Sequence, residues 1–216
     1  MHPAVRHLGN KVREARSRLG LSQRQLAERA GLSPGMLCLI ERGEANPSVQ
    51  SLLGLAEALG LSLTSFFDDQ PERATTGEDT PGSSSSWRRM VLPAEMRPVL
   101  ELAGGITWSR LTPGPEAGVE FREVRYEPGA CSSPKPIQHA GREWGLVLEG
   151  ELMLELGPER LLLRPGDSVV FDSRIPHRTL NIGAAPMRAV WVNFQHGPGT
   201  GGPPSEPEPS KARRGR

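Results

Sequence analysis

The chain has 216 residues and a formal net charge of +1, which suits one domain or two modest ones able to bury a core. The near-neutral charge excludes binding to nucleic acid through a global positive field, so such affinity has to come from local charge. Cys38 and Cys131 form no CxxC pattern, which argues against a disulfide framework or a zinc finger. The N-terminus lacks the apolar run of a signal peptide, and no window approaches about 18 consecutive apolar residues, so we expect a cytoplasmic protein without a membrane span.

Composition divides the chain into four parts. Helical periodicity with few prolines runs over 5–67, and a polar Pro/Gly/Ser-rich stretch follows over 68–93. Short β-like runs separated by Pro and Gly occupy 94–196, and 197–216 is of low complexity. We therefore predict an all-α domain, a flexible linker, an all-β domain and a disordered tail.

The N-terminal part predicts a bundle of short helices. Apolar residues recur every three or four positions from Val5 to Leu19, and Gly20 ends that helix. Three further helices are predicted, over "QRQLAERA", over "PGMLCLIERG" and after "ANPS". Each follows a serine suited to an N-cap, namely Ser22, Ser33 and Ser48 in that order. A short segment, "LTSFF", closes the bundle. Two short helices joined by a glycine turn inside such a bundle predict a helix-turn-helix.

The same residues carry a family resemblance. From Gly20 to Leu59, "GLSQRQLAERAGLSPGMLCLIERGEANPSVQSLLGLAEAL" resembles, without a gap, the pattern GLSQ..LA..AG.S...L..IERG...PS...L..IA.AL of helix-turn-helix domains of the Cro/phage-repressor (XRE) type. The resemblance implies that the helix opened by Ser33 enters the major groove while the preceding helix crosses the backbone. It also implies a structural pair between Arg16 and Glu41.

The resemblance and the groove-facing positions together give the predicted DNA contacts. Contacts to the DNA backbone, or positions next to them, are predicted for Gln23, Arg24, Arg42 and Asn46. The groove-facing helix supplies Ser33, Pro34, Gly35 and Leu39. Cys38 and Leu39 replace the polar residues that relatives often carry. Because bidentate base reading needs Arg, Asn or Gln, we expect thymine methyl groups, backbone contacts and DNA shape to supply much of the specificity.

Local charge indicates how many copies bind. Eight Arg and Lys against five Glu before residue 60 leave +3, which is weak for a monomer and adequate for a dimer. We therefore expect a homodimer on a near-palindromic double-stranded DNA operator with half-sites about one helical turn apart.

The C-terminal part predicts a small β-barrel or jelly roll, because period-two runs alternate with turn glycines. Within it, "LVLEGELMLEL" predicts a hairpin that turns near Glu149 and Gly150, and "RPGDSVVF" predicts a turn through Pro165 and Gly166 into the next strand.

Residues 98–194 resemble the cupin family. In "HAGREWGLVLEG", His139, Glu143 and Gly150 fit the first cupin motif, G-x5-H-x-H-x3-E-x6-G, and "HRTLN" supplies the histidine and asparagine of the second as His177 and Asn181. The resemblance implies a jelly-roll barrel, and "PGDSVVFDSRIPHRTLNIG" is typical of cupins fused to XRE-type modules. The first motif histidine is replaced by Ile137, which cannot ligate a metal.

His139, Glu143 and His177 thus remain as a two-His-one-carboxylate set, which suits a divalent transition metal such as Zn, Fe, Mn or Ni with open coordination positions. Two alternatives stay open at this point. The same residues could hydrogen-bond an organic ligand in a metal-free pocket, or satisfy one another with no ligand at all.

Three functions compete. The first is a transcriptional regulator whose barrel senses a small-molecule effector, with no catalytic residues. The second is a metal-dependent cupin enzyme, dioxygenase- or isomerase-like, with an accessory DNA-binding domain. The third is a DNA-binding module whose barrel only dimerises. The attached DNA-binding domain, which a metabolic enzyme has no reason to keep, favours the regulator.

Overall fold

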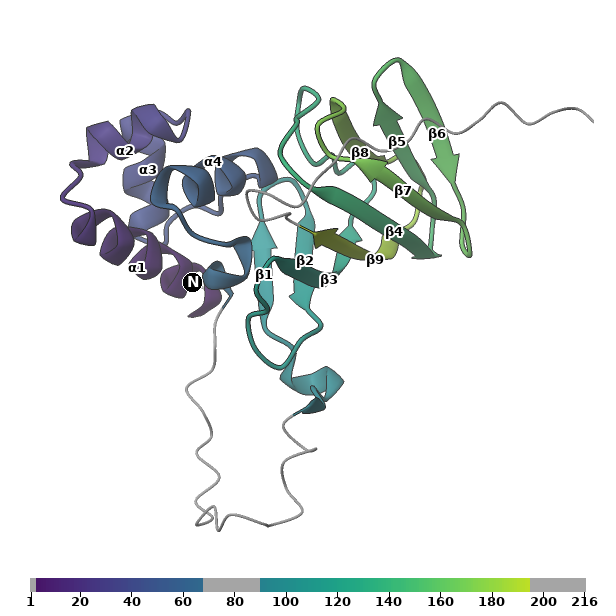
Figure 1. The fold of residues 1–216 in the computed structure, drawn as a ribbon, viewed down its shortest axis with the longest axis horizontal. Helices are drawn as coiled ribbons and strands as arrows, with labels where there is room; N and C mark the ends of the chain where they lie inside the picture. Colours follow the sequence, from purple (N-terminus) through teal and green to yellow (C-terminus); the bar gives the residue numbers. More distant parts are fainter. Residues whose placement is uncertain (1–2, 68–89, 195–216) are drawn as a thin grey trace, which may run out of the picture.

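The computed structural model describes residues 3–67 and 90–194, which form a helical part and a β part lying side by side (Figure 1). The all-α bundle followed by an all-β barrel is the predicted fold class, and it is confirmed. Residues 68–89 of the predicted linker and all of the predicted tail lie outside the described residues. Among the described helices, none is long and apolar enough to cross a membrane.

The helical part contains α1 (Pro3–Arg18), α2 (Gln23–Arg29), α3 (Pro34–Glu41), α4 (Val49–Leu59) and the 3-10 turn η1 (Leu63–Phe66). The three predicted serine caps are all present, because each hydroxyl accepts a hydrogen bond from a first-turn backbone N–H: Ser22 from Gln25, Ser33 from Met36 and Ser48 from Ser51.

The predicted end of the third helix needs correction. The third helix ends at Glu41, two residues before the end of "PGMLCLIERG", because Gly43 takes a left-handed φ of 68° that a helix cannot continue through. The closing segment "LTSFF" is present as a 3-10 turn.

The β part begins with the 3-10 turn η3 (Ala94–Met96). Nine strands follow: β1 (Val99–Leu102), β2 (Ile106–Arg110), β3 (Val119–Tyr126), β4 (Arg142–Glu149), β5 (Leu152–Leu156), β6 (Glu159–Leu163), β7 (Ser168–Asp172), β8 (His177–Asn181) and β9 (Met187–Phe194). They form a six-stranded sheet in the order β1-β2-β3-β9-β4-β7 and a three-stranded sheet in the order β6-β5-β8. All pairings are antiparallel, and the buried faces of the two sheets enclose the barrel interior.

The predicted hairpin at Glu149 and Gly150 is wrong. Strand β4 pairs with β7 and β9, whereas β5 pairs with β6 and β8, so the chain changes sheets at this point. Gly150 has a φ of 73°, and a Cβ there would lie 2.8 Å from both the Pro186 carbonyl oxygen and the Met187 Cα. The glycine therefore marks a crowded barrel corner. The predicted turn through Pro165 and Gly166 is present, since the Asp167 N–H donates to the Arg164 carbonyl at 2.9 Å.

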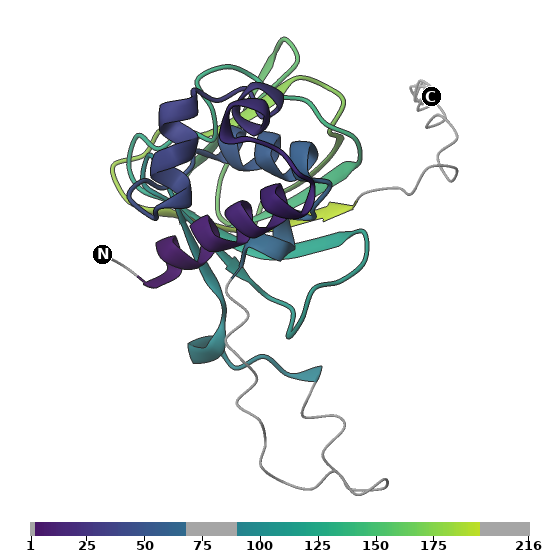
Figure 2. The ribbon, with the colours of Figure 1, turned by 90° about the vertical axis from the view of Figure 1, so that its left-hand side faces the viewer.

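The helical bundle covers one end of the β part, as Figure 2 shows with the helices in front of the strands. Helix α1 packs against β1, and the Ala103 N–H after β1 donates to the Pro47 carbonyl just before α4 at 2.9 Å. This contact places α4 beside the barrel interior.

Candidate functional site

A buried ion pair fixes the helices of the helix-turn-helix. Arg16 donates from Nε and Nη2 to the two carboxylate oxygens of Glu41 at 2.6 and 3.0 Å. The Gln23 amide donates to the same carboxylate at 2.8 Å, and Glu41 is only 2% exposed. Helices α1, α2 and α3 therefore meet at one carboxylate, and Glu41 holds the bundle together.

The face around the start of α3 is open. Arg24, Arg42 and the residues that open α3 (Ser33, Pro34 and Gly35) are exposed, while Gln23, Leu39, Asn46 and Cys38 are half-buried. Met36, 41% exposed on the same helix, was not among the predicted contacts. Gln23, predicted to anchor a phosphate, holds Glu41 in this structure.

Replacing Arg42 with alanine is expected to weaken binding to every DNA sequence and to flatten its salt dependence. Arg42 is exposed, and its partner is the equally exposed Glu44 at 2.8 Å. Loss of one phosphate contact lowers the slope of log K against log salt by about 0.9. Anisotropy titrations of a mixed-sequence duplex at several salt concentrations measure both effects. Arg160→Ala, an equal charge change at an exposed position of the β part, is the control; a slope equal to that of the control would remove Arg42 from the contacts.

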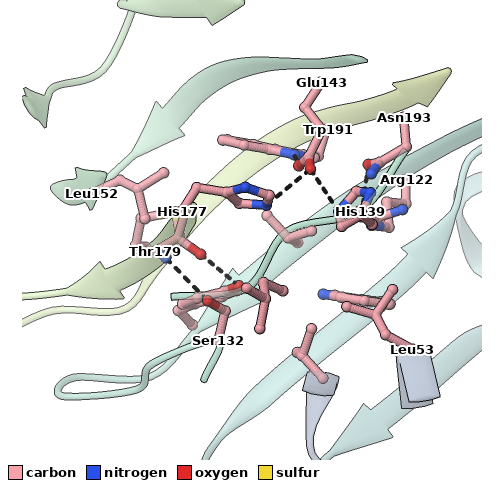
Figure 3. A pocket seen from close by; sticks show the side chains of 16 residues that line it. Leu53, Arg122, Ser132, His139, Glu143, Leu152, His177, Thr179, Trp191 and Asn193 are labelled. Carbon is pink, nitrogen blue, oxygen red and sulfur yellow. Dashed lines mark hydrogen bonds and ion pairs between the residues drawn. The ribbon is translucent and has the colours of Figure 1, made fainter. Parts of the chain in front are cut away.

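The second site lies inside the barrel. Glu143 projects from β4 of the six-stranded sheet, His177 from β8 of the opposite sheet, and His139 from the loop before β4 (Figure 3). The two Nε2 atoms lie 3.0 Å (His139) and 3.1 Å (His177) from the same carboxylate oxygen, Glu143 Oε1. The structure therefore brings together all three residues predicted to form the site.

The contacts on the other ring nitrogens show what these atoms face. His177 Nδ1 lies 2.8 Å from the Ile175 carbonyl and His139 Nδ1 lies 3.2 Å from the Ala140 carbonyl, so the hydrogen bonds assign a proton to each Nδ1. Both Nε2 atoms then face the same carboxylate oxygen, Glu143 Oε1, at ion-pair distance. Neither approach has hydrogen-bond alignment, so Oε1 has no aligned hydrogen-bond donor among the described residues. A cation placed between these three atoms would contact all of them.

Titration follows from the same geometry. Burial alone would raise the pKa of the Glu143 carboxyl, but the two adjacent imidazoles outweigh it and hold that pKa well below its usual range. Burial alone would lower the pKa of His139, yet the neighbouring Glu143 carboxylate raises it. Glu143 therefore stays ionised and supplies the negative charge of the cluster.

The donor set fits a divalent transition metal. The candidate ligand atoms all lie within 4.8 Å of one another, and ligand atoms about 2.1 Å from one tetrahedral ion are roughly 3.4 Å apart. The backbone carbonyls on both Nδ1 atoms would orient the rings, as the outer contacts of metal-bound histidines do. Trp191 Nε1 donates to Glu143 Oε2, which leaves Oε1 for the cation. The cluster is thus compatible with a metal.

The pocket carries a second polar group. Arg122 is 6% exposed and donates from Nη1 to Glu120 at 2.6 Å and from Nη2 to Asn193 at 2.8 Å. Its guanidinium lies 4.2 Å above the Trp108 ring. Arg122 Nε and Trp108 Nε1 are buried without a partner in the described part of the chain. Sequence reasoning did not single out Arg122, Glu120 or Asn193.

Two motif positions have structural roles. Ile137, where the cupin motif has its first histidine, lines the pocket and pairs with His177 through two backbone hydrogen bonds of 2.8 Å. The Asn181 amide donates to the carbonyls of Tyr126 and Ala185, both at 2.9 Å, and thereby holds the turn after β8. Neither residue has a free polar group directed at a ligand.

Comparisons with known proteins agree with both domains. A helix-turn-helix family model matches residues 12–66 and a cupin domain model matches residues 122–193. The transcriptional regulator PuuR of Escherichia coli is 30% identical over 187 residues, which cover 84% of this chain and 91% of that protein. SutR, a second regulator of Escherichia coli, is 26% identical and covers 82% and 88% respectively.

A crystal structure of a regulator of the same helix-turn-helix family from Vibrio cholerae superposes with a TM-score of 0.61. It is 22% identical and covers 88% of this chain and 96% of that one, so it supports the fold of both domains together. The match to PuuR extends over nearly the whole of that protein. The chain therefore belongs to the family of XRE-type helix-turn-helix transcriptional regulators that carry a C-terminal cupin domain.

Proposed function

We propose that this regulator binds an operator through the open face around α3 and senses a small molecule in the barrel pocket. The observation that carries the proposal is the convergence of His139, Glu143 and His177 on one cation position inside the barrel, in a chain whose DNA-binding face is open. The predicted DNA contacts remain as proposed: Gln23, Arg24, Ser33, Pro34, Gly35, Leu39, Arg42 and Asn46. We propose that the regulator acts in the cytoplasm, on a double-stranded DNA operator.

The pocket chemistry indicates what the effector offers. A Zn, Fe, Mn or Ni ion bound by His139, Glu143 and His177 would present open coordination positions to it. In the same pocket, the unpartnered donors Arg122 Nε and Trp108 Nε1 favour a hydrogen-bond acceptor, such as a carboxylate or carbonyl oxygen. The proposed effector is a small polar molecule with such an acceptor, held with or without the metal.

We further propose a homodimer formed through the outer face of the six-stranded sheet. Phe121, Val192, Trp144 and Val170 are paired neighbours across β3, β9, β4 and β7. Trp144 and Val170 are 39% and 49% exposed, and an exposed apolar row of this kind is typical of a protein–protein contact. A second copy suits it, because the +3 charge of one helical domain needs a partner for firm DNA binding.

Native mass spectrometry with elemental analysis, on protein purified without added metal, tests the proposal directly. We expect the mass of a dimer that carries about one metal ion or small molecule per chain. The affinity for DNA is expected to differ between the protein with this ligand bound and the protein from which it has been removed. A chain that binds neither metals nor metabolites would favour a barrel that only dimerises.

Replacing His177 with alanine is expected to abolish this response while DNA binding by the stripped protein is unchanged. The substitution removes one of three ligands from a site far from α3, and loss of even an outer contact to a metal ligand lowers affinity about 10- to 100-fold. Thermal shift with Zn, Mn and Ni and anisotropy with DNA measure the two properties separately. Arg160→Ala, at an exposed position of the same domain, should change neither; loss of DNA binding by a folded His177→Ala protein would contradict a separate sensor.

The enzyme remains a second candidate because the same three ligands leave coordination positions open. Conversion of any compound that binds in the screen, with the metal present, would favour a dioxygenase- or isomerase-like activity. Binding without conversion, together with a change in DNA affinity, would favour the regulator.

A further inference from the structure

Helix α4 of the DNA-binding domain forms one wall of the barrel pocket. Val49 and Leu53, one turn apart on α4, line the cavity together with the barrel side chains that also surround His139, Glu143 and His177. Val49 is only 4% exposed, and Leu53 lies across the pocket from Glu143 (Figure 3). Two apolar side chains that do not belong to the barrel therefore form one wall of the pocket.

The start of α4 is tied both to the barrel and to the rest of the helix-turn-helix. The Ala103 N–H donates to the Pro47 carbonyl at 2.9 Å, one residue before the Ser48 cap. Next to Leu53, a Cβ on Gly54 would lie 2.5 Å from the Ala30 carbonyl oxygen at the end of α2. The backbones of α2 and α4 are thus in direct contact, so a shift of α4 carries α2 with it.

The size of the cavity decides what fits without such a shift. Its volume is about 50 Å³, which holds roughly three or four water molecules at about 15 Å³ each. An apolar cavity that admits benzene has about 150 Å³, and ligand pockets commonly have about 300–1,000 Å³. A metal ion with its waters fits this space, whereas an organic effector does not.

The pocket can grow most readily on the side of α4. Most other walls are strands, in which β9 pairs with both β3 and β4, and β5 pairs with both β6 and β8. The loop residues Ser132, Ile137 and His139 complete these walls, and their backbone N–H groups donate to the carbonyls of Thr179, His177 and Ser173. Val49 and Leu53 project from a helix outside these paired strands, so displacing them breaks no sheet hydrogen bond.

We propose that Val49 and Leu53 are the lid of the effector pocket, and that an organic effector binds by displacing α4 and with it the DNA-binding domain. This inference rests on the proposed function and supplies its coupling step. An effector shifts the equilibrium between two domain arrangements only if it binds one of them better, and here the closed arrangement has too little room for it. The position of α4 therefore depends on the size of the molecule in the pocket.

A side chain that fills the pocket permanently tests the lid without any effector. Val124 lies on β3, is 5% exposed and lines the cavity. Val124→Phe is expected to push α4 away, so the Ala103 amide loses its bond to Pro47 and exchanges with solvent about ten-fold faster or more, as overpacking of this size would produce. The Gly129 amide, bonded to the Asn181 carbonyl within the barrel, reports whether the barrel stays folded. Affinity for a mixed-sequence duplex is expected to change about five-fold or more.

Removing the lid side chain should reverse the effect. Val124→Phe combined with Leu53→Ala is expected to restore Ala103 protection, because the added ring then occupies the space that Leu53 leaves. Val124→Phe combined with Glu57→Ala, an exposed position one turn later on α4, is the matched control and should stay open. Leu53→Trp overfills the pocket from α4 and leaves the barrel sequence unchanged. If Val124→Phe disturbs the Gly129 amide, exchange at Ala103 in Leu53→Trp tests the lid instead.

The lid would be overturned if the Ala103 amide of Leu53→Trp exchanged at the wild-type rate. It would also be overturned if Glu57→Ala restored Ala103 protection in Val124→Phe as well as Leu53→Ala does. Unchanged DNA affinity in a variant with an exposed Ala103 amide would overturn the link to DNA binding. No variant requires effector, metal or operator, so these failures are distinct from a failure of the proposed function, which appears as absent loading or absent DNA binding in the wild-type chain.

Discussion

Replacing Glu41 with alanine is expected to destabilise the helical domain by about 3–5 kcal/mol, the usual effect of removing one partner of a buried ion pair. The change leaves the Arg16 guanidinium and the Gln23 amide without the carboxylate that accepts three of their hydrogen bonds. Because domains of this kind are stable by about 5–15 kcal/mol, the loss is a large fraction of the total. Urea unfolding followed by circular dichroism at 222 nm measures it, since the helices of the described chain all lie in this domain apart from the short 3-10 turn η3.

Glu44→Ala is the matched control, because it removes a carboxylate from an exposed pair with Arg42 and should cost at most about 1 kcal/mol. Glu41→Leu combined with Arg16→Met should recover much of the stability, since apolar side chains of similar volume often replace a buried pair without loss. A Glu41→Ala variant as stable as the Glu44→Ala control would show that the pair only orients α3.

Helix starts and the helix-turn-helix could be read from the sequence because their causes are local. Ser22, Ser33 and Ser48 act on N–H groups three residues away, and Gly43 ends α3 through its own φ. Strand partners have non-local causes. The sequence around Gly150 has the alternation of a hairpin, yet the crowding that turns the chain into the second sheet comes from Pro186 and Met187.

The candidate site divides in the same way. His139, Glu143 and His177 were identified because they match a motif whose residues lie close together in the folded barrel. The burial of Arg122 follows from the period of β3: once Val124 and Tyr126 face inward, Arg122 and Glu120 do too, and Phe121 faces solvent. A charged residue in a strand nevertheless looks exposed from sequence alone. Nothing near Val49 and Leu53 indicates the barrel, since their part in the pocket depends on how two domains pack.

Gly145→Ala is expected to destabilise the barrel and to disrupt the metal site from a position that is not a ligand. Gly145 pairs with Trp191 in the sheet and faces inward. An added Cβ would lie 2.2 Å from the indole, at Cζ3, so the ring has to move away from Glu143, to which its Nε1 donates. Overpacking of this kind costs about 1–3 kcal/mol, and each kcal/mol lowers the Tm of a domain of about 100 residues by about 4–8 °C.

Thermal unfolding followed by tryptophan fluorescence, with and without Zn or Mn, measures stability and metal affinity in one experiment. Gly114→Ala is the control, because a Cβ there meets nothing within 4 Å. Trp191→Phe together with Gly145→Ala makes room for the added methyl group and should recover the Tm. It should not recover metal affinity, because phenylalanine cannot donate to Glu143 and orienting contacts of this kind are worth about 10- to 100-fold. Recovery of both would mean that Trp191 acts by filling space, while recovery of the Tm alone would establish that its indole N–H positions the carboxylate on which both histidines converge.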